Sequence, residues 1–301
     1  MVRRSRVPGA CSAYGAAELK TFVPANRMLR KSLIVSPLLL ATFVLSAQMQ
    51  SPAARQQSHP RQTNTKAKPI PAIPAKPDAV VPFAAGEKLE YQLLWSSYHV
   101  HAATLEFSVV EKRNFFGHSA WHFRLVARTI NTMGTVYPLS DQFDSYTDAV
   151  QLSSLQYEQY LHELTTTQSF VYRMSSAGEP APAGASAVRV LPGTRDAVGF
   201  VYALRAVDWQ HTPQLNAPVF DGRNLYDVHA RVEAVNDTVQ VPAGHLPATR
   251  IAVDVYENGK LRQDTRFHLW LGKDAARTPL LIQADVPIGT ARVELLSLPK
   301  R

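Results

Sequence analysis

The chain has 301 residues, 46% hydrophobic and 9% aromatic, a composition typical of a folded protein with a sizeable core. Its formal net charge of +8 arises near the N-terminus: residues 1–47 contribute +6 and residues 48–82 contribute +4, which leaves −2 for residues 83–301. That near-neutral remainder lacks the basic excess that phosphate binding requires, so nucleic-acid binding is not expected.

Residues 28–47 are predicted to form an export signal. Two basic residues follow Met28, then come about thirteen apolar residues and a pair of small ones. A helix of that length spans about 20 Å, less than the ~30 Å hydrocarbon core of a membrane, so a cleaved signal is favoured over an uncleaved anchor. No stable transmembrane span is expected after cleavage. Residues 1–27 are then expected to be unstructured, or a gene-model extension upstream of a start at Met28.

The next segment, residues 48–82, contains seven of the 21 prolines and shows no apolar periodicity. Such a composition favours extended polyproline II structure and cannot bury enough apolar surface to offset chain entropy. We therefore predict a disordered, semi-rigid linker between the export signal and a single domain at residues 83–301.

Cysteine use agrees with export. Cys11 is the only cysteine, and it precedes the predicted signal. A mature chain would therefore contain no disulfide, no thiolate nucleophile and no cysteine-bound metal ion.

The predicted domain shows the period-two pattern of β-strands that have one buried face. In its first stretch, Leu89, Tyr91 and Leu93 alternate with polar residues. Asn258-Gly259 predicts a two-residue type I′ hairpin. Further alternating stretches occupy residues 105–109, 121–128, 226–235, 249–257, 265–271, 280–286 and 291–298.

One segment, residues 195–209, shows helical spacing, and Asp196 is placed to cap its N-terminus. Ten or more antiparallel strands with one helix predict a mostly β domain. We expect a strongly curved antiparallel sheet or an open β-barrel with one covering helix at about residues 196–209. Such a sheet encloses an apolar interior that is filled either with side chains or with ligand, and the sequence leaves both possibilities open.

The densest polar segment, residues 141–148, follows Tyr137-Pro138 and supplies the first candidate binding residues. Its carboxylates could serve acid–base catalysis or bind a ligand, although the D-x-D-x-D-G spacing of a calcium loop is absent. A polar sheet edge with a turn cap is the alternative. On a strand, three of these residues would share a face opposite Phe143. The candidates are Tyr137, Asp141, Asp144, Tyr146 and Asp148.

A second candidate group lies on or beside the predicted helix: Arg195, Asp196, Tyr202 and Arg205. An ion pair between this helix and residues 141–148 would anchor the helix, and gating of a ligand is the alternative.

Motifs of established chemistry are missing from the sequence. There is no glycine-rich phosphate-binding motif, no G-x-S-x-G nucleophile elbow and no H-E-x-x-H zinc motif. His99 and His101 would share a strand face but lack a recognisable third ligand. We therefore predict no catalytic residue, no metal ion and no cofactor.

Four segments carry a family resemblance. They are F-A-A-G-E-K-L-E-Y at residues 83–91, the polar segment at residues 137–148, Arg195-Asp196 with residues 202–205, and residues 267–289. In this order they resemble a bacterial envelope family, domain of unknown function 3108, over residues 83–298. The resemblance implies an exported, mostly antiparallel β protein with no assigned activity and no known catalytic residues. It also implies a fold similar to the open barrels of envelope lipid and lipoprotein carriers.

Export, the linker and the alternating strands predict a non-enzymatic protein of the periplasm or cell envelope that binds an apolar or lipid-like ligand in a curved sheet. An envelope scaffold that contacts a protein partner is the first alternative. The second is a glycan or peptidoglycan hydrolase that uses two of Asp141, Asp144, Asp148 and Asp196.

Overall fold

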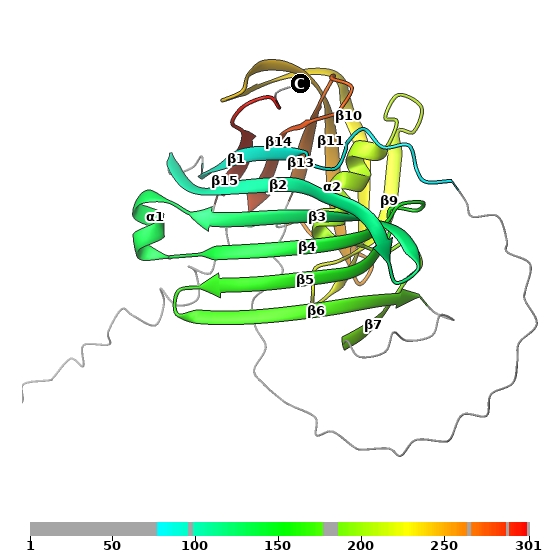
Figure 1. The fold of residues 1–301 in the computed structure, drawn as a ribbon. Helices are drawn as coiled ribbons and strands as arrows, with labels where there is room; N and C mark the ends of the chain where they lie inside the picture. The colour runs from blue at the N-terminus through cyan, green and yellow to red at the C-terminus, as the bar shows by residue number, and fades with distance from the viewer. Residues whose placement is uncertain (1–76, 96–98, 177–185, 264–265, 287–288, 300–301) are drawn as a thin grey trace, which may run out of the picture. The chain divides into compact units, whose positions relative to one another are not determined.

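The computed structural model describes residues 77–95, 99–176, 186–263, 266–286 and 289–299 (Figure 1). The predicted extension, the export signal and most of the predicted linker, residues 1–76, lie outside the described residues. Among the residues that are described, no helix is both long enough and apolar enough to cross a membrane.

Strands dominate the domain, as the period-two sequence predicts. The first half of the domain contains β1 (Lys88–Trp95), β2 (Val100–Phe115), β3 (His118–Thr129), β4 (Ser140–Asp148), β5 (Ser154–Glu163), β6 (Thr166–Ser176) and β7 (Ser186–Val190). The second half contains β8 (Arg195–Asp196), β9 (Gln214–Phe220), β10 (Leu225–Val241), β11 (Gly244–Glu257), β12 (Lys260–Leu261), β13 (Arg266–Gly272), β14 (Pro279–Val286) and β15 (Gly289–Leu295).

These strands form one sheet in the order β7-β6-β5-β4-β3-β2-β1-β15-β14-β13-β11-β10-β9-β8, with β12 paired to β11. Neighbours are antiparallel except β6–β7 and β8–β9, which are parallel. The first and last strands join the two halves, with Tyr91 of β1 opposite Leu295 of β15. The sheet path ends at β7 and β8, so the sheet curves strongly without closing, which confirms the predicted fold class (Figure 1).

Turn chemistry explains the hairpin at β11–β12. Asn258 and Gly259 have φ values of 51° and 75°, and Glu257 pairs with Lys260 across the turn. Positive φ at both central residues is what a type I′ turn requires. The predicted hairpin is therefore confirmed.

The predicted helix is α2 (Ala197–Ala206). Asp196 caps it as predicted, because its carboxylate accepts a hydrogen bond from the Gly199 backbone N–H at 2.8 Å. Every residue from Ala197 to Arg205 is buried. The helix therefore lies inside the curve of the sheet, where its whole circumference is packed (Figure 1).

A second helix corrects the expectation of only one. The short helix α1 (Asn131–Val136) connects β3 to β4, has no side-chain cap and contains no buried residue. Six residues that include Gly134 and of which only Met133 packs against the core give no apolar periodicity, so sequence patterning could not reveal this helix.

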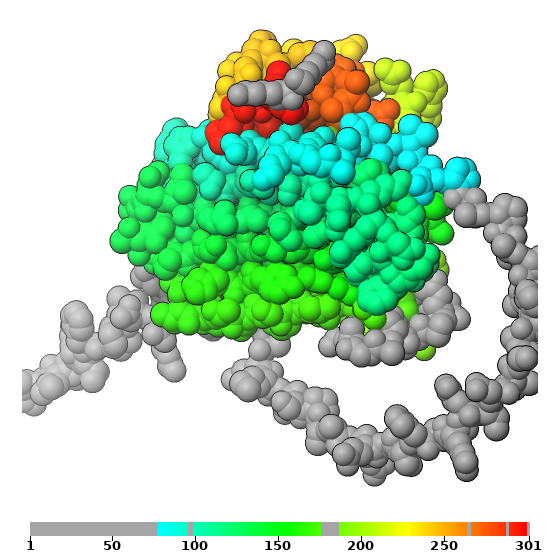
Figure 2. Space-filling view, in the orientation of Figure 1, coloured from blue at the N-terminus to red at the C-terminus, as the bar shows by residue number. Residues whose placement is uncertain are grey.

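The domain begins before residue 83. The Ala79 N–H donates to the Ala149 carbonyl at 2.8 Å, and Ala79 and Val81 pack against the core. In Figure 2 the start of the described chain (cyan) lies across the molecule between the strands of the first half (green) and the C-terminal strands (orange and red). The last residues of the predicted linker, 77–82, are thus part of the domain.

Candidate functional site

Asp196 ties the start of α2 to the sheet. Its side chain is fully buried, and its carboxylate accepts hydrogen bonds from the Ser145 hydroxyl at 2.6 Å and the Ser154 hydroxyl at 2.5 Å. Burial raises the pKa of Asp196, while these hydrogen bonds and the one from Gly199 oppose the increase. The contacts connect the helix to β4 and β5.

Arg205 anchors the other end of the helix. Its two Nη atoms donate to the Glu87 carboxylate at 2.6 and 3.0 Å, and one of them also donates to the Ala276 carbonyl. The prediction of an ion pair between the helix and residues 141–148 is therefore wrong, because the partner of Arg205 is Glu87. Arg205 follows Asp196 by nine positions, which is about 14 Å along a helix. Of these two residues, therefore, only Asp196 lies beside β4.

The other two residues of the helix group also make structural contacts. Tyr202 stacks on Phe123 with a centroid separation of 3.8 Å, and the edge of Phe83 packs against it at 5.2 Å. Arg195 donates to the carbonyls of Gly193 at 3.0 Å and Gln151 at 3.3 Å, and burial lowers its pKa.

Asp144, Tyr146 and Asp148 share the face opposite Phe143, as predicted. Asp144 accepts hydrogen bonds from Arg124 at 2.8 Å and Gln142 at 2.6 Å, and the His122 Nε2 lies 2.5 Å from it. Burial acts to raise the pKa of Asp144, but these hydrogen bonds outweigh burial and lower it. Tyr146 stacks on His122 and on Phe115, and Asp148 accepts hydrogen bonds from the N–H groups of Val150 and Gln151.

Asp141 and Tyr137 form a separate cluster near the start of β4 and the end of β5. Asp141 Oδ1 accepts from the His162 N–H at 2.9 Å, and the Tyr137 hydroxyl donates to Glu163 at 2.9 Å. Asp141 Oδ2 is buried without a hydrogen-bond partner among the described residues. Burial, reinforced by nearby Glu163, raises the pKa of Asp141 to about 7 despite the His162 hydrogen bond.

The nine predicted residues thus fall into three places: the ends and flank of α2, the outer face of β4, and the start of β4. In the described part of the chain, no group of three or more His, Cys, Asp or Glu side chains is arranged to hold a metal ion.

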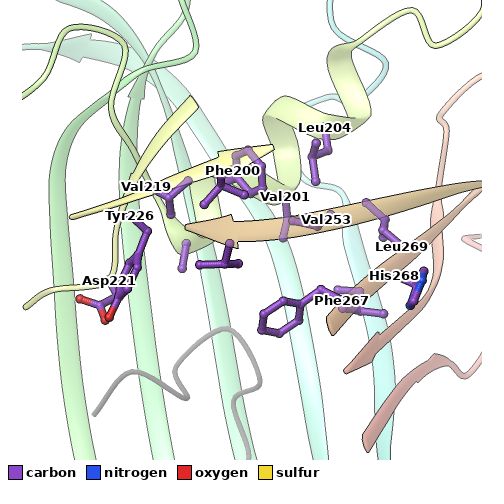
Figure 3. A pocket seen from close by; sticks show the side chains of 14 residues that line it. Phe200, Val201, Leu204, Val219, Asp221, Tyr226, Val253, Phe267, His268 and Leu269 are labelled. Carbon is purple, nitrogen blue, oxygen red and sulfur yellow. The ribbon is translucent and has the colours of Figure 1, made fainter. Parts of the chain in front are cut away.

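An apolar cavity of about 80 Å³ lies between α2 and the second half of the sheet. Its described lining contains none of the nine predicted residues. Figure 3 shows the lining, with Asp221 and Tyr226 together at one end of a row of apolar side chains. That row includes Phe200, Val201 and Leu204 of α2 and Val219, Val253 and Leu269 of the sheet.

Sequence reasoning missed these lining residues because each one belongs to an ordinary alternating strand or an apolar helix face. Period-two patterning shows which side chains point inward, but it does not show where the inward side chains leave a cavity between them. Asp221-Gly222 is recognisable as a turn, yet nothing in a turn signature reports burial of the carboxylate.

Three solved structures resemble this chain at low identity. A β-barrel-like protein of domain of unknown function DUF1849 from Brucella abortus is 11% identical, with 70% of this chain and 95% of that chain covered and a TM-score of 0.45. A candidate lipoprotein from Parabacteroides distasonis is 10% identical, with coverages of 74% and 100% and a TM-score of 0.34. A candidate exported protein with a YmcC-like fold from Bacteroides fragilis is 9% identical, with coverages of 74% and 100% and a TM-score of 0.33.

A search of curated proteins finds no match to this chain. The profile of one family, described as protein of unknown function (DUF3108), matches residues 90–296, which is the greater part of the chain. The match confirms the resemblance inferred from the motifs at residues 83–91, 137–148, 195–205 and 267–289. The chain therefore belongs to the DUF3108 family of proteins of unknown function.

Proposed function

We propose that this protein is a non-enzymatic, exported component of the cell envelope that binds an apolar or lipid-like ligand between α2 and the second half of the sheet. The observation that carries the proposal is the apolar cavity bounded by α2, β9, β10, β11, β13 and β14. The predicted export signal and linker support the envelope location.

The size of the cavity limits what it accepts without rearrangement. Apolar cavities of about 150 Å³ can bind benzene, whereas pockets for larger ligands reach roughly 300–1,000 Å³. A cavity of about 80 Å³ takes a few methylene groups of a chain. A longer chain requires the sheet to widen at the opening between β7 and β8, the two ends of the sheet path.

The contacts of three of the four predicted carboxylates argue against hydrolysis. A glycoside hydrolase places two carboxylates on one substrate, about 5–9.5 Å apart. Here Asp196 is engaged by serines beside α2, Asp144 by side chains on the outer face, and Asp148 by backbone N–H groups of a turn. A ligand-binding role for the nine predicted residues stays a prediction, and the observed contacts favour anchoring for Asp196 and Arg205.

Native mass spectrometry and organic extraction of the full-length protein, purified from its host, test the proposal. We expect an amphiphile to co-purify at a defined stoichiometry and to dissociate as a small molecule. Repeated recovery of ligand-free protein that also fails to bind added chains would overturn the proposal. Recovery of a stoichiometric protein partner without any lipid would favour the scaffold alternative instead.

A further inference from the structure

Asp221 and His268 are polar residues of the cavity lining. Asp221 follows β9 and begins the turn into β10. Asp221 Oδ1 accepts hydrogen bonds from the backbone N–H groups of Arg223 at 2.7 Å and Asn224 at 2.6 Å. The Gln159 side-chain amide donates to the Asp221 carbonyl at 2.8 Å. These contacts fix both the backbone and one oxygen of the carboxylate.

Gly222 makes this close arrangement possible. Its φ is +104°, and a Cβ atom built on it would lie 2.6 Å from the Gln159 side-chain nitrogen. The turn thus holds Asp221 against β5, and the Tyr172 and Phe220 rings pack edge to face beside it at 5.3 Å.

The second carboxylate oxygen has no such contact. Asp221 is 5% exposed and lines the cavity, and its Oδ2 is buried without a hydrogen-bond partner in the described part of the chain. Burial of a polar atom without a partner costs free energy, so buried carboxylates are normally satisfied by donors. In Figure 3 the Asp221 carboxylate lies beside Tyr226 at the end of the apolar row.

We propose that the cavity binds a single-chain amphiphile whose hydrogen-bond-donating head, a hydroxyl or an ammonium group, contacts Asp221 Oδ2 while its chain lies along Phe200, Val219 and Val253. The inference rests on the proposed function and deepens it by naming the ligand class. The oxygens of an ionised carboxylate can only accept hydrogen bonds, so at about pH 8 this oxygen selects for a donor. A carboxylate head would instead bring two like charges together in a site of low polarity.

Calorimetric titration of the full-length protein at about pH 8 with three ten-carbon probes tests the inference: decanol, decylamine and decanoate. The chains are the same, so the differences report the head group. We expect decanol and decylamine to bind at least about tenfold more tightly than decanoate, which corresponds to about 1.4 kcal/mol.

The variant Asp221→Asn assigns the preference to this residue. The amide keeps the shape of the side chain and an oxygen for the turn, but it places a donor where the free oxygen was. We expect the gap between decanol and decanoate to shrink below about threefold. The matched control is Asp274→Asn, because Asp274 also caps a turn, accepts from Thr278 at 3.1 and 2.8 Å, and lies outside the cavity lining. Asp274→Asn should keep the wild-type difference in affinity between decanol and decanoate.

The outcomes separate the two proposals. Equal affinities for the three probes, or tightest binding of decanoate, would overturn the role of Asp221 while leaving chain binding intact. Binding of none of the probes would overturn the proposed function and the inference together. If Asp221→Asn fails to unfold cooperatively, the wild-type series alone still decides between these results.

Discussion

Arg205 is the largest side chain that the domain buries almost completely, and its charge is balanced by Glu87 in the segment before β1. Burial lowers the pKa of Arg205, but the Glu87 carboxylate outweighs burial and raises it. Bidentate pairing of this kind is strong because two charge-assisted hydrogen bonds act together. The pair joins α2 to the N-terminal segment of the domain.

Removal of Glu87 should therefore be costly. Glu87→Ala leaves the Arg205 charge buried without compensation, so we expect a loss of about 3–5 kcal/mol in the free energy of unfolding, measured in urea. Glu106→Ala is the control, since its pair with Lys88 at 3.6 Å is exposed and should contribute less than about 1 kcal/mol. Similar small losses in both variants would contradict the anchoring role of Arg205.

Asp141 makes stability depend on pH. Its pKa is about 7 in the folded protein against an ordinary value of 3.8, so the folded state binds more protons between those values. Its contribution is therefore fully present below about pH 4 and is lost as pH rises to about 7, with a slope of up to about 1.4 kcal/mol per pH unit.

Urea unfolding between about pH 2 and 8 should show this slope above about pH 4 in the wild type and a flatter profile in Asp141→Asn. Asp144→Asn provides a comparison of opposite sign, because its lowered pKa contributes stability that is lost as pH falls below about 4. An unchanged profile in Asp141→Asn would show that Asp141 does not titrate in this range.

At the scale of elements, α2 approaches β4 closely at Gly199. A Cβ atom on Gly199 would lie 3.0 Å from Thr147 Oγ1 and 3.1 Å from the hydroxyl oxygens of Ser145 and Ser154. Ser145 and Ser154 both donate hydrogen bonds to Asp196, so their hydroxyl groups cannot rotate away without losing these bonds.

Replacing a helical glycine with alanine usually stabilises a protein, but we expect Gly199→Ala to destabilise this one. In an unconstrained helix the change gains about 0.5–1 kcal/mol. Here we expect a loss of about 1–3 kcal/mol from overpacking against three hydroxyl groups. Thermal unfolding checks the sign, and a stabilised variant would mean that α2 has room to shift away from the sheet.

The sequence predicts many of the elements, for physical reasons that differ among them, but its alternating stretches do not include β5, β6, β7 or β9. In β1, Leu89, Tyr91 and Leu93 are buried on one face, and the period-two pattern reports that directly. The Asn258-Gly259 turn and the Asp196 cap are local chemistry and are equally readable. The short helix α1 and the two-residue strand β8 (Arg195–Asp196) depend on tertiary contacts and leave no periodic signal.

At the scale of the whole molecule, the boundary between linker and domain lies earlier than proline content indicates. Val81 is half-buried and packs against the core, whereas the adjacent Val80 is 94% exposed. We expect Val81→Ser to lower the free energy of unfolding by about 1 kcal/mol and Val80→Ser to leave it within about 0.5 kcal/mol. Equal effects of the two changes would place this segment outside the folded unit.

The candidate site was less predictable than the fold. Polar residues at 137–148 and 195–205 stand out in the sequence, but their side chains bind one another and the backbone. The cavity instead depends on how far α2 stands from β10 and β11, a distance that no residue pattern encodes. Two polar atoms of its described lining, Asp221 Oδ2 and His268 Nδ1, are buried without a hydrogen-bond partner among the described residues, and they become visible only when burial and hydrogen bonds are known together.

The most direct test of ligand binding is to fill the cavity and measure binding of decanol by calorimetry. Val255 lines the cavity and Val241 does not, and both are almost fully buried, so Val255→Phe and Val241→Phe carry a similar overpacking cost of about 1–3 kcal/mol. We predict that Val255→Phe weakens decanol binding at least about tenfold while Val241→Phe keeps wild-type affinity. Equal affinity in both variants, or no binding by the wild-type protein, would contradict the proposal that this cavity is the ligand site.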